Sequence, residues 1–434
     1  MPHALGIDFG TSGVRACAID SDGVILAEGR TGLPVPQRAG TCVSQDPGQW
    51  WQALEQVLNE LAARSALARV ERIAVDGTAA TLLLCAPDGT PLTPALMYND
   101  ARAADTLARI CAAAPPEAPV HSASSSLAKL LWLRERYPVQ GARALHQAEW
   151  IAGRLSGRFD QGDENNALKL GYDPVRRRWP QWLQRLELDA GLLPAIQPAG
   201  TPLMPLLPDL ARRWGFPDAV TVCAGTTDST AAVIAAGAVQ PGQAVTVLGS
   251  TLVLKVISPQ PVSAPEYGIY SHRLGDVWLV GGASNAGGAV LRQHFSDARM
   301  AELTPQLRPD RPTCLEYYPL PAPGERFPWN DPRRMPKLHP RPTSDLKFFQ
   351  GILEGLTRIE RSGYRRLRAL GAPWPGEVLS SGGGAGNAPW RAIRERLLRC
   401  PVKLATQQEA AYGSARLAQG LACWSRPGRR SYNA

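Results

Sequence analysis

The stretch LGIDFGTSGVRACAID, residues 5–20, decides the fold class of this chain. An apolar run leads to Asp8, and a second run, residues 14–19, follows the next turn before a Ser-Asp-Gly hairpin signal. That turn consists of Gly10, Thr11, Ser12 and Gly13. Its N–H groups and hydroxyls suit phosphate oxygens, and a carboxylate beside it suits Mg²⁺. An ordinary hairpin with a glycine-rich loop has the same pattern, so both interpretations stay open.

The same design recurs in the second half of the chain. An apolar run over residues 244–248 is followed by Gly249, Ser250 and Thr251 and by a second apolar run, residues 252–257. Elsewhere strand-like and helix-like segments alternate, which is typical of an α/β protein. The repeat predicts a duplicated α/β architecture with phosphate bound between the two halves.

Composition excludes several classes of protein. The 434 residues predict two or three domains, and 44% apolar with 20% charged residues is ordinary for a globular chain. The net charge of +9 comes from dispersed arginines, and no nucleic-acid-binding motif surrounds them. Eight cysteines without CxxC spacing and six scattered histidines argue against zinc. No apolar stretch approaches the ~20 residues that span a bilayer. We expect a cytoplasmic protein without nucleic-acid or membrane partners.

Two further strand ends carry polar groups. A strand over residues 219–224 runs into Asp228 at the start of a small-residue helix, residues 231–238. Ligands bind at such strand ends, although an aspartate there also serves as a helix N-cap. A later strand, residues 377–381, enters Gly382-Gly383-Gly384-Ala385-Gly386-Asn387, where glycines indicate close backbone approach. Residues 99–215 read as mainly helical, and residues 305–342 are too rich in proline for regular helix.

Nine segments in this order resemble the FGGY carbohydrate kinases of the actin and sugar-kinase ATPase superfamily. They are GIDFGTSGVRACAID, QDPGQWW, ALMYNDAR, the SxSxxKLLWL pattern, AGTTDSTAA, VLGST, PGERFPWNDP, SSGGGAGNAPWR and EAAYGSARLA. The resemblance implies an α/β chain of two related domains with the actin-like ATPase (ribonuclease H-like) fold, flanking a central cleft. Residues 1–235 would bind the sugar, with a helix at residues 409–425 returning to them, and residues 236–408 would bind ATP.

The resemblance also implies roles for single residues. Asp228 matches the general base, and Asp8 matches the carboxylate that supports Mg²⁺ and the acceptor hydroxyl. The two acids are expected to converge from opposite sides of a hinged crevice. The residues that match ATP-binding positions are Gly10, Thr11 and Ser12, then Gly249, Ser250 and Thr251, then Gly383, Gly384 and Asn387, with Trp390 near adenine.

One departure from the family bears on the acceptor. Xylulose kinases of the family carry a Met-His pair where this chain has Gly77 and Thr78. This turn and the short chain look like the D-ribulose kinases, with Thr78, Asp8 and Asp228 as substrate contacts. The expected reaction is therefore phosphorylation of D-ribulose to D-ribulose 5-phosphate with ATP and Mg²⁺, by a monomer or homodimer. D-xylulose or another sugar or polyol is the alternative acceptor, and a non-catalytic ATP-binding relative is a third hypothesis, against which retention of both acids speaks.

Overall fold

A computed structural model describes residues 1–420 of the protein. The chain divides into two compact units. Unit 1 contains Met1–Ala235, His272–Gly275 and, among the described residues, 409–420. Unit 2 contains Ala236–Ser271 and Asp276–Gln408.

Unit 1 is built on a mixed seven-stranded sheet of order β12-β13-β6-β1-β2-β3, with β14 paired to β6. The strands are β1 (Ala4–Phe9), β2 (Gly13–Ile19), β3 (Ile25–Gly32), β6 (Arg72–Gly77), β12 (Pro202–Pro205), β13 (Thr221–Cys223) and β14 (Thr226–Thr227). The hairpin that the sequence predicts after Ile19 is present, since β2 pairs antiparallel with β3. Because β1, β6 and β14 are parallel, their carboxyl ends meet at one edge of the sheet.

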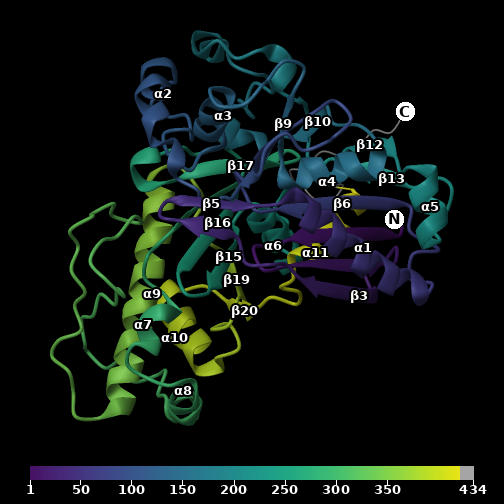
Figure 1. The fold of residues 1–434 in the computed structure, drawn as a ribbon. Coiled ribbons are helices and arrows are strands. Elements are labelled where there is room, and N and C mark those ends of the chain that lie inside the picture. The colour runs from purple at the N-terminus through teal and green to yellow at the C-terminus, as the bar shows by residue number, and fades with distance from the viewer. Residues whose placement is uncertain (421–434) are drawn as a thin grey trace. The chain divides into compact units, whose positions relative to one another are not determined.

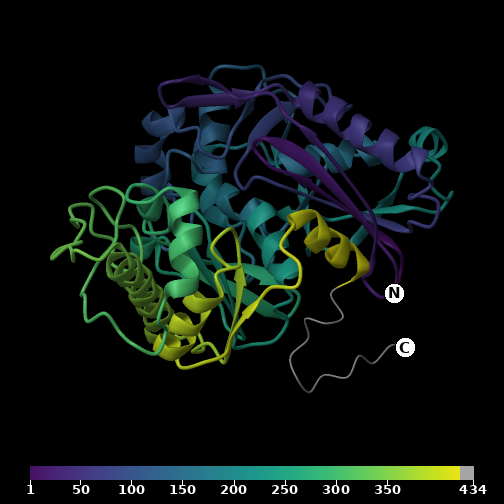
Figure 2. The same ribbon diagram turned by 90° about the horizontal axis from the view of Figure 1, so that it is seen from below.

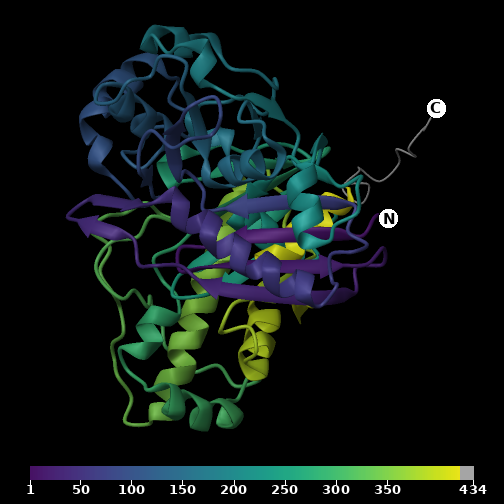
Figure 3. The ribbon, with the colours of Figure 1, turned by 45° about the vertical axis from the view of Figure 1, so that its right-hand side comes forward.

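One face of this sheet is covered by α1 (Pro47–Ala63), whose apolar stripe includes the buried Trp50, Leu54 and Leu58. The helix begins where the Asp46 carboxylate accepts a hydrogen bond from the Gly48 N–H at 2.8 Å, as expected of an N-cap. Figure 3 shows α1 lying across the purple strands. This side of unit 1 is therefore an ordinary sheet–helix core.

Helix α11 (Ala410–Gln419) packs so closely against β1 that the main chains of the two elements are in contact (Figure 2). A Cβ atom on Gly6 of β1 would lie 1.9 Å from the Ala411 carbonyl oxygen. A Cβ atom on Gly413 would lie 1.8 Å from the Ala231 carbonyl oxygen in α6 (Asp228–Ala236). Two glycines thus let α11 fit between β1 and α6. Positions 421–425 of the helix expected at 409–425 lie outside the described residues.

The expectation that residues 99–215 are mainly helical is wrong in part. Short helices do occur there, but strands lie among them, and β9 (Arg143–His146) pairs antiparallel with β7 (Leu82–Cys85). A four-residue buried run fits a strand as well as a helix, so periodicity cannot separate the two. The helices are η1 (Arg102–Thr106), α2 (Leu107–Ala113), α3 (Ser126–Arg134), α4 (Gln147–Ser156), η2 (Ala167–Leu170), η3 (Gln181–Leu186), η4 (Ala190–Leu192) and α5 (Pro208–Trp214). The remaining strands of unit 1 are β4 (Gln37–Ala39), β5 (Cys42–Gln45), β8 (Ala95–Leu96), β10 (Gln161–Asp163) and β11 (Ala195–Gln197).

Unit 2 is built on a six-stranded sheet of order β17-β18-β16-β15-β19-β20 (Figure 1). The strands are β15 (Gln243–Leu248), β16 (Leu252–Ser258), β17 (Tyr270–Leu274), β18 (Val277–Ala283), β19 (Glu377–Ser381) and β20 (Val402–Leu404). The run β20-β19-β15-β16-β18 has the same order and pairing senses as β13-β6-β1-β2-β3 in unit 1. The two-domain α/β design expected from the sequence repeat is confirmed.

The helices of unit 2 form a second core with its sheet. They are α7 (Gly288–Arg292), α8 (Asp297–Leu303), α9 (Asp345–Ala369) and α10 (Ala388–Leu398), with 3₁₀ turns η5 (Pro265–Tyr267) and η6 (Thr304–Gln306). Between η6 and α9 the described chain has isolated bridges but neither helix nor strand, as its proline content predicts. None of the helices within residues 1–420 has the length and apolar character needed to cross a membrane.

Candidate active site

Three carboxylates meet at the carboxyl ends of the parallel strands of unit 1. Asp8 of β1 is the register partner of Asp76 in β6, and Asp76 is in turn the partner of Thr226 in β14. Asp228 follows two residues later, where α6 begins. Asp8 and Asp76 are buried and Asp228 is partly buried. The sheet therefore brings three acidic side chains close together at one edge, where like charges repel each other.

The two acids predicted from the sequence both belong to unit 1. The expectation that they converge from opposite sides of a hinge is therefore wrong. The physical reason is the topology: β14 pairs with β6, next to β1, so one sheet edge carries Asp8 and, just past β14, Asp228.

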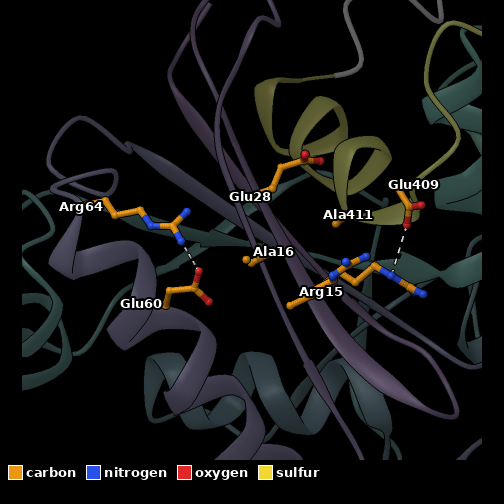
Figure 4. Close-up of a pocket in the computed structure, with 9 residues that line it drawn as sticks. Arg15, Ala16, Glu28, Glu60, Arg64, Glu409 and Ala411 are labelled. Carbon is orange, nitrogen blue, oxygen red and sulfur yellow. Dashed lines mark hydrogen bonds and ion pairs between the residues drawn. The ribbon is translucent and has the colours of Figure 1, made fainter.

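Asp8 is held by an arginine on the neighbouring strand. Arg15 is its cross-strand partner in β2, and the Arg15 Nη1 donates to the Asp8 Oδ2 at 3.0 Å. The Arg15 Nε lies 3.3 Å from the Glu409 Oε2, and Figure 4 shows these two side chains turned toward each other. They line a groove of about 600 Å³ whose arginines and glutamates balance: Arg15, Arg30 and Arg64 against Glu28, Glu60 and Glu409. The groove offers no excess positive charge to a phosphate.

Asp76 was not among the predicted site residues. The Ser414 hydroxyl of α11 donates to its Oδ2 at 2.6 Å, whereas its buried Oδ1 has no hydrogen-bond partner among the described residues. Burial, and then the nearby Asp8 carboxylate, raise the pKa of Asp76 well above its ordinary value. Asp76 could have been predicted from its position, because it is an acid near the carboxyl end of a strand that pairs in parallel with β1.

Asp228 contacts a backbone donor at the start of α6. Its Oδ1 accepts from the Ser229 N–H at 2.6 Å. Burial, with a smaller contribution from Asp8, raises the pKa of Asp228 to about 6. Asp228 therefore stands at the first turn of α6, directly after β14, which pairs with the end of β6.

Thr78 lies in that loop and is buried. Its Oγ1 is 2.6 Å from the Thr81 Oγ1 and 3.0 Å from the Gln147 Oε1. The Gln147 Oε1 can only accept, so Thr78 donates to Gln147, and Thr81, whose Oγ1 accepts from the Tyr98 N–H at 3.0 Å, donates to Thr78. The hydroxyl proton of Thr78 is thus used inside the protein, which leaves one lone pair on its oxygen for a ligand.

The first predicted phosphate turn joins β1 to β2. The Gly10 N–H donates to the Gly13 carbonyl at 3.0 Å, and the Ser12 carbonyl accepts from the Leu33 N–H at 2.9 Å. Thr11 is partly exposed and Ser12 is exposed. The turn is therefore fixed by backbone hydrogen bonds, and solvent reaches both of its hydroxyl-bearing residues.

Unit 2 brings the other predicted nucleotide loops together. The turn from Gly249 to Thr251 joins β15 to β16, and the Gly384 N–H, in the loop after β19, donates to the Leu248 carbonyl at 3.1 Å. Gly383 has open space where a Cβ atom would stand. The two glycine-rich loops are neighbours at one edge of this sheet, as the parallel pairing of β15 with β19 requires.

Asn387 and Trp390 support this edge from inside unit 2. The Asn387 Oδ1 accepts from the Trp390 N–H at 2.9 Å and so caps α10. Trp390 is buried, and its indole N–H donates to the Thr357 hydroxyl at 3.0 Å. A Cβ atom on Gly384 would lie 2.7 Å from its ring. Trp390 therefore packs directly beneath the loop that carries Gly384.

Asn165 and Asn166, in a polar segment before Gly171, are buried. The Asn165 Nδ2 donates to the Thr226 Oγ1 at 3.0 Å, and the Asn166 Nδ2 donates to the Thr226 carbonyl at 3.1 Å. Lys169 lies near enough to lower the pKa of Asp228 by its charge. These side chains hold β14, two residues ahead of Asp228.

The acid cluster fits a magnesium ion that is held mostly by phosphate and water. Asp8 supplies carboxylate oxygens at a strand end, and Mg²⁺ usually takes one or two such ligands. Within the described part of the chain, no group of three or more His, Cys, Asp and Glu side chains could hold a metal alone.

The duplicated sheets and the acid cluster define a two-domain α/β scaffold of the phosphotransferase class. The chain belongs to the FGGY family of carbohydrate kinases: residues 3–235 match the N-terminal domain of that family, and residues 244–421 match its C-terminal domain. It is an ATP-dependent sugar kinase, and the family resemblance noted from the sequence is confirmed.

Similar proteins include several kinases. The chain is 27% identical over 436 residues to the xylulose kinase of Escherichia coli (strain K12), covering 96% of this chain and 89% of that protein. It is 28% identical over 470 residues to the xylulose kinase of Streptomyces coelicolor, covering 97% and 88%. The crystal structure of a "xyloylose kinase" from Brucella ovis has the same fold, with a TM-score of 0.86, 24% identity and coverage of 96% and 90%.

Proposed function

We propose that this kinase transfers the γ-phosphoryl group of ATP to the terminal hydroxyl of a ketopentose, with D-ribulose as the acceptor and D-ribulose 5-phosphate as the product. The observation that carries the proposal is the position of Asp228, beside Asp8 and Asp76 at one sheet edge. The carboxylate of Asp228 removes the proton from the attacking hydroxyl, and its pKa of about 6 keeps it ionised at neutral pH. General-base catalysis of this kind contributes typically ~10²–10⁴-fold.

Positioning and charge neutralisation supply most of the remaining catalysis of phosphoryl transfer. Magnesium, when bound through Asp8, would neutralise charge on the transferring phosphate. Thr11 and Ser12 offer N–H groups and hydroxyls to phosphate oxygens from unit 1, and the bond from the Gly10 N–H to the Gly13 carbonyl fixes the turn that holds them. In unit 2, Ser250 and Thr251 are the corresponding residues, Gly249 and Gly384 fix their loops by backbone bonds, Gly383 leaves open space, and Asn387 and Trp390 shape the nucleoside site. Unit 1 is thus assigned to the sugar and unit 2 to the nucleotide.

D-ribulose is favoured by the loop after β6. Gly77 and Thr78 stand where family members that act on xylulose have Met and His, so the two side-chain contacts of that pair are missing. Thr78 retains one oxygen lone pair that accepts a hydrogen bond from a sugar hydroxyl. D-xylulose is the second candidate, and what favours it is the similarity over nearly the whole chain to relatives named xylulose kinase.

An ATP-consumption assay with purified protein against D-ribulose, D-xylulose, L-ribulose and glycerol tests the acceptor. We expect the highest kcat/KM with D-ribulose. An equal or higher value with D-xylulose overturns the choice of acceptor and leaves the kinase assignment intact. Absence of turnover with all four supports the non-catalytic hypothesis instead.

A further inference from the structure

The proline-rich stretch between η6 and α9 contains a buried acid that takes no part in the proposed reaction. Glu325 lies in the segment PGERFPWNDP, residues 323–332, and is 2% exposed. Two backbone bonds fix it there, because the Glu325 N–H donates to the Asp331 carbonyl at 2.8 Å and the Asp331 N–H donates to the Glu325 carbonyl at 2.6 Å. A carboxylate is seldom buried to this extent unless its oxygens have partners.

The carboxylate of Glu325 accepts hydrogen bonds from five donors. Its Oε2 accepts from the Ser284 hydroxyl at 2.7 Å and from the Tyr318 hydroxyl at 3.0 Å. Its Oε1 accepts from three backbone N–H groups, those of Asn285 (2.8 Å), Arg326 (3.0 Å) and Phe327 (3.4 Å). A carboxylate has about four lone-pair sites, so these bonds use its accepting capacity and leave none for a metal ion or a substrate. Glu325 therefore acts on the protein around it.

Two of the five donors belong to the segment that directly follows β18. The Ser284 Oγ, besides donating to Glu325, accepts from the Ala286 N–H at 3.0 Å. The Asn285 Nδ2 donates to the Gly324 carbonyl at 3.1 Å, next to Glu325 in the sequence. The start of this segment is thus held by Glu325 and its neighbour through both backbone and side chains.

The same segment is bonded to the turn from Gly249 to Thr251. Four backbone hydrogen bonds join residues 284–289 to residues 249–252: from Ser284 to Leu252 (2.9 Å), Leu252 to Ala286 (2.7 Å), Gly288 to Gly249 (2.8 Å) and Ala289 to Ser250 (3.2 Å). A Cβ atom on Gly287 would lie 2.5 Å from the Ser250 carbonyl oxygen, so the two main chains are in contact. Each of these contacts, like those of Glu325, lies within unit 2.

We propose that Glu325 is a positioning residue for the phosphates of ATP: through Ser284 and Asn285 it fixes the segment that holds the turn from Gly249 to Thr251. The inference rests on the proposed assignment of that turn to the phosphates. Glu325 does not touch the nucleotide. A turn that binds through its N–H and hydroxyl groups has the required geometry only while its main chain is held, and a misplacement of 1 Å can cost about 10²-fold.

The contacts require an acceptor at this position. A leucine or methionine of similar size would leave all five donors without their partner. Glutamine keeps the shape but replaces one acceptor oxygen by an NH₂ donor. Because three backbone N–H groups need the oxygen, the NH₂ group falls on the Oε2 side, where the Ser284 and Tyr318 hydroxyls lose their acceptor. Glu325→Gln is therefore a mild change with a defined defect.

Two hydroxyls on the same carboxylate oxygen provide a matched test. Ser284→Ala and Tyr318→Phe each remove one donor to the Glu325 Oε2, but only Ser284 belongs to the segment bonded to the turn. Phenylalanine also keeps the ring whose centroid lies 4.2 Å from the Arg334 Cζ. For the wild type, these two variants and Glu325→Gln, calorimetry measures the Kd of ADP with Mg²⁺. Steady-state kinetics measures the KM values for ATP and for the preferred sugar, and thermal unfolding measures the midpoint.

We expect Glu325→Gln to raise the Kd of ADP and the KM for ATP by roughly tenfold, and Ser284→Ala to raise both by roughly threefold to tenfold. The KM for the sugar stays within about twofold, because the contacts lie in unit 2. Tyr318→Phe lowers the unfolding midpoint but leaves nucleotide affinity within about twofold of wild type. Unchanged nucleotide affinity in Glu325→Gln or Ser284→Ala, or an equal weakening in Tyr318→Phe, overturns the inference.

A fourth variant separates the inference from the assignment on which it rests. Ser250 is exposed in the turn, and in Ser250→Asp the new carboxylate repels the phosphates of the nucleotide. Wild-type ADP affinity in Ser250→Asp overturns the assignment of the turn itself. Weaker ADP binding in Ser250→Asp, with unchanged affinity in Glu325→Gln and Ser284→Ala, overturns only the role of Glu325. Should Glu325→Gln fail to fold, Ser284→Ala decides, because it removes a single hydroxyl.

Discussion

The two strand–turn–strand segments, β1–β2 in unit 1 and β15–β16 in unit 2, share one topology and differ in chemistry. In each, the first strand pairs antiparallel with the next and parallel with a strand from far along the chain. Two residues before the turn glycine, unit 1 has Asp8, paired with Asp76 and Arg15. The corresponding place in unit 2 is Val247, paired with Ser381 and Val253.

The difference shows that both copies have the same strand–turn–strand fold, whereas the acid that we propose for catalysis at this position occurs in unit 1 and is replaced by Val247 in unit 2. Four residues before the same turn glycine, unit 1 has Gly6 and unit 2 has Val245. Gly6 makes room for α11, and α11 brings Ser414 to Asp76. In unit 1 the acid cluster and the helix that contacts it thus depend on Asp8 and Gly6, whereas unit 2 has Val247 and Val245 at the matching positions.

The largest effect is expected at Asp228. Asp228→Asn keeps the shape and the backbone contacts but removes the base, so kcat/KM for the sugar falls by roughly 10²–10⁴-fold while the fold is retained. Asp46→Asn is the control, because Asp46 caps α1 with a similar backbone bond of 2.8 Å. Steady-state kinetics and thermal unfolding check both. Wild-type turnover in Asp228→Asn contradicts the assignment of the base.

A second large effect separates the two copies directly. Asp8→Asn weakens magnesium binding and charge neutralisation, so we expect a loss of about 10²-fold in kcat/KM and a higher magnesium requirement. Val247→Ala at the matching place in unit 2 removes only packing and lowers stability by about 1 kcal/mol. Magnesium titrations of the two variants make the comparison. Equal losses of activity would mean that the two copies are chemically equivalent.

The close packing of α11 predicts a loss of stability that is specific to unit 1. In Gly6→Ala the new Cβ atom would meet the Ala411 carbonyl oxygen at 1.9 Å and the Ala415 nitrogen at 2.2 Å. Backbone atoms cannot give way, so we expect a cost of about 3 kcal/mol. Gly383→Ala adds its Cβ atom to open space, and its free energy of unfolding should stay within about 0.5 kcal/mol of wild type. Denaturant unfolding of both variants measures the difference.

The most gradual effect is the pH dependence that comes from Asp228. Its folded pKa of about 6 lies above its ordinary value of 3.8, so kcat/KM should fall about tenfold per pH unit below pH 6. Stability responds in the opposite sense: between about pH 4 and pH 6 the folded state binds the extra proton, so the contribution of this group to stability grows as the pH falls. Rate profiles and unfolding midpoints over pH 4–8 check both signs. Activity that is flat down to pH 4.5 contradicts the titration.

Much of the fold could be predicted from the sequence because its signals are local. The turn at Gly10, the hairpin after Ile19 and the N-cap at Asp46 each depend on a few adjacent residues, and each is present. The duplicated design was also visible, because Gly-Ser-Thr between two apolar runs recurs at Gly249.

The rest depends on pairing between distant parts of the chain. Asp76 became part of the cluster through the register of β6 with β1, which the residues around it do not specify. The placement of Asp8 and Asp228 in one unit follows from β14 joining the same sheet. Short buried runs such as β9 were ambiguous because four apolar residues fit a strand or a helix. Lys129 belongs to the SxSxxKLLWL segment, but its burial could not be predicted, because the two carbonyls that its Nζ contacts, those of Ala80 and Met97, lie 49 and 32 residues away in the sequence.

The position of Ser414 has a consequence for how the enzyme is made. During synthesis, β1 and β6 are made hundreds of residues before Ser414, whose hydroxyl bonds to Asp76. Until then the cavity occupied by α11 stands open over Gly6, and the carboxyl group of Asp76 lacks its hydroxyl partner. We therefore expect a chain truncated before residue 409 to be less stable and less active than the full chain, because unit 1 then lacks both α11 and the hydroxyl partner of Asp76.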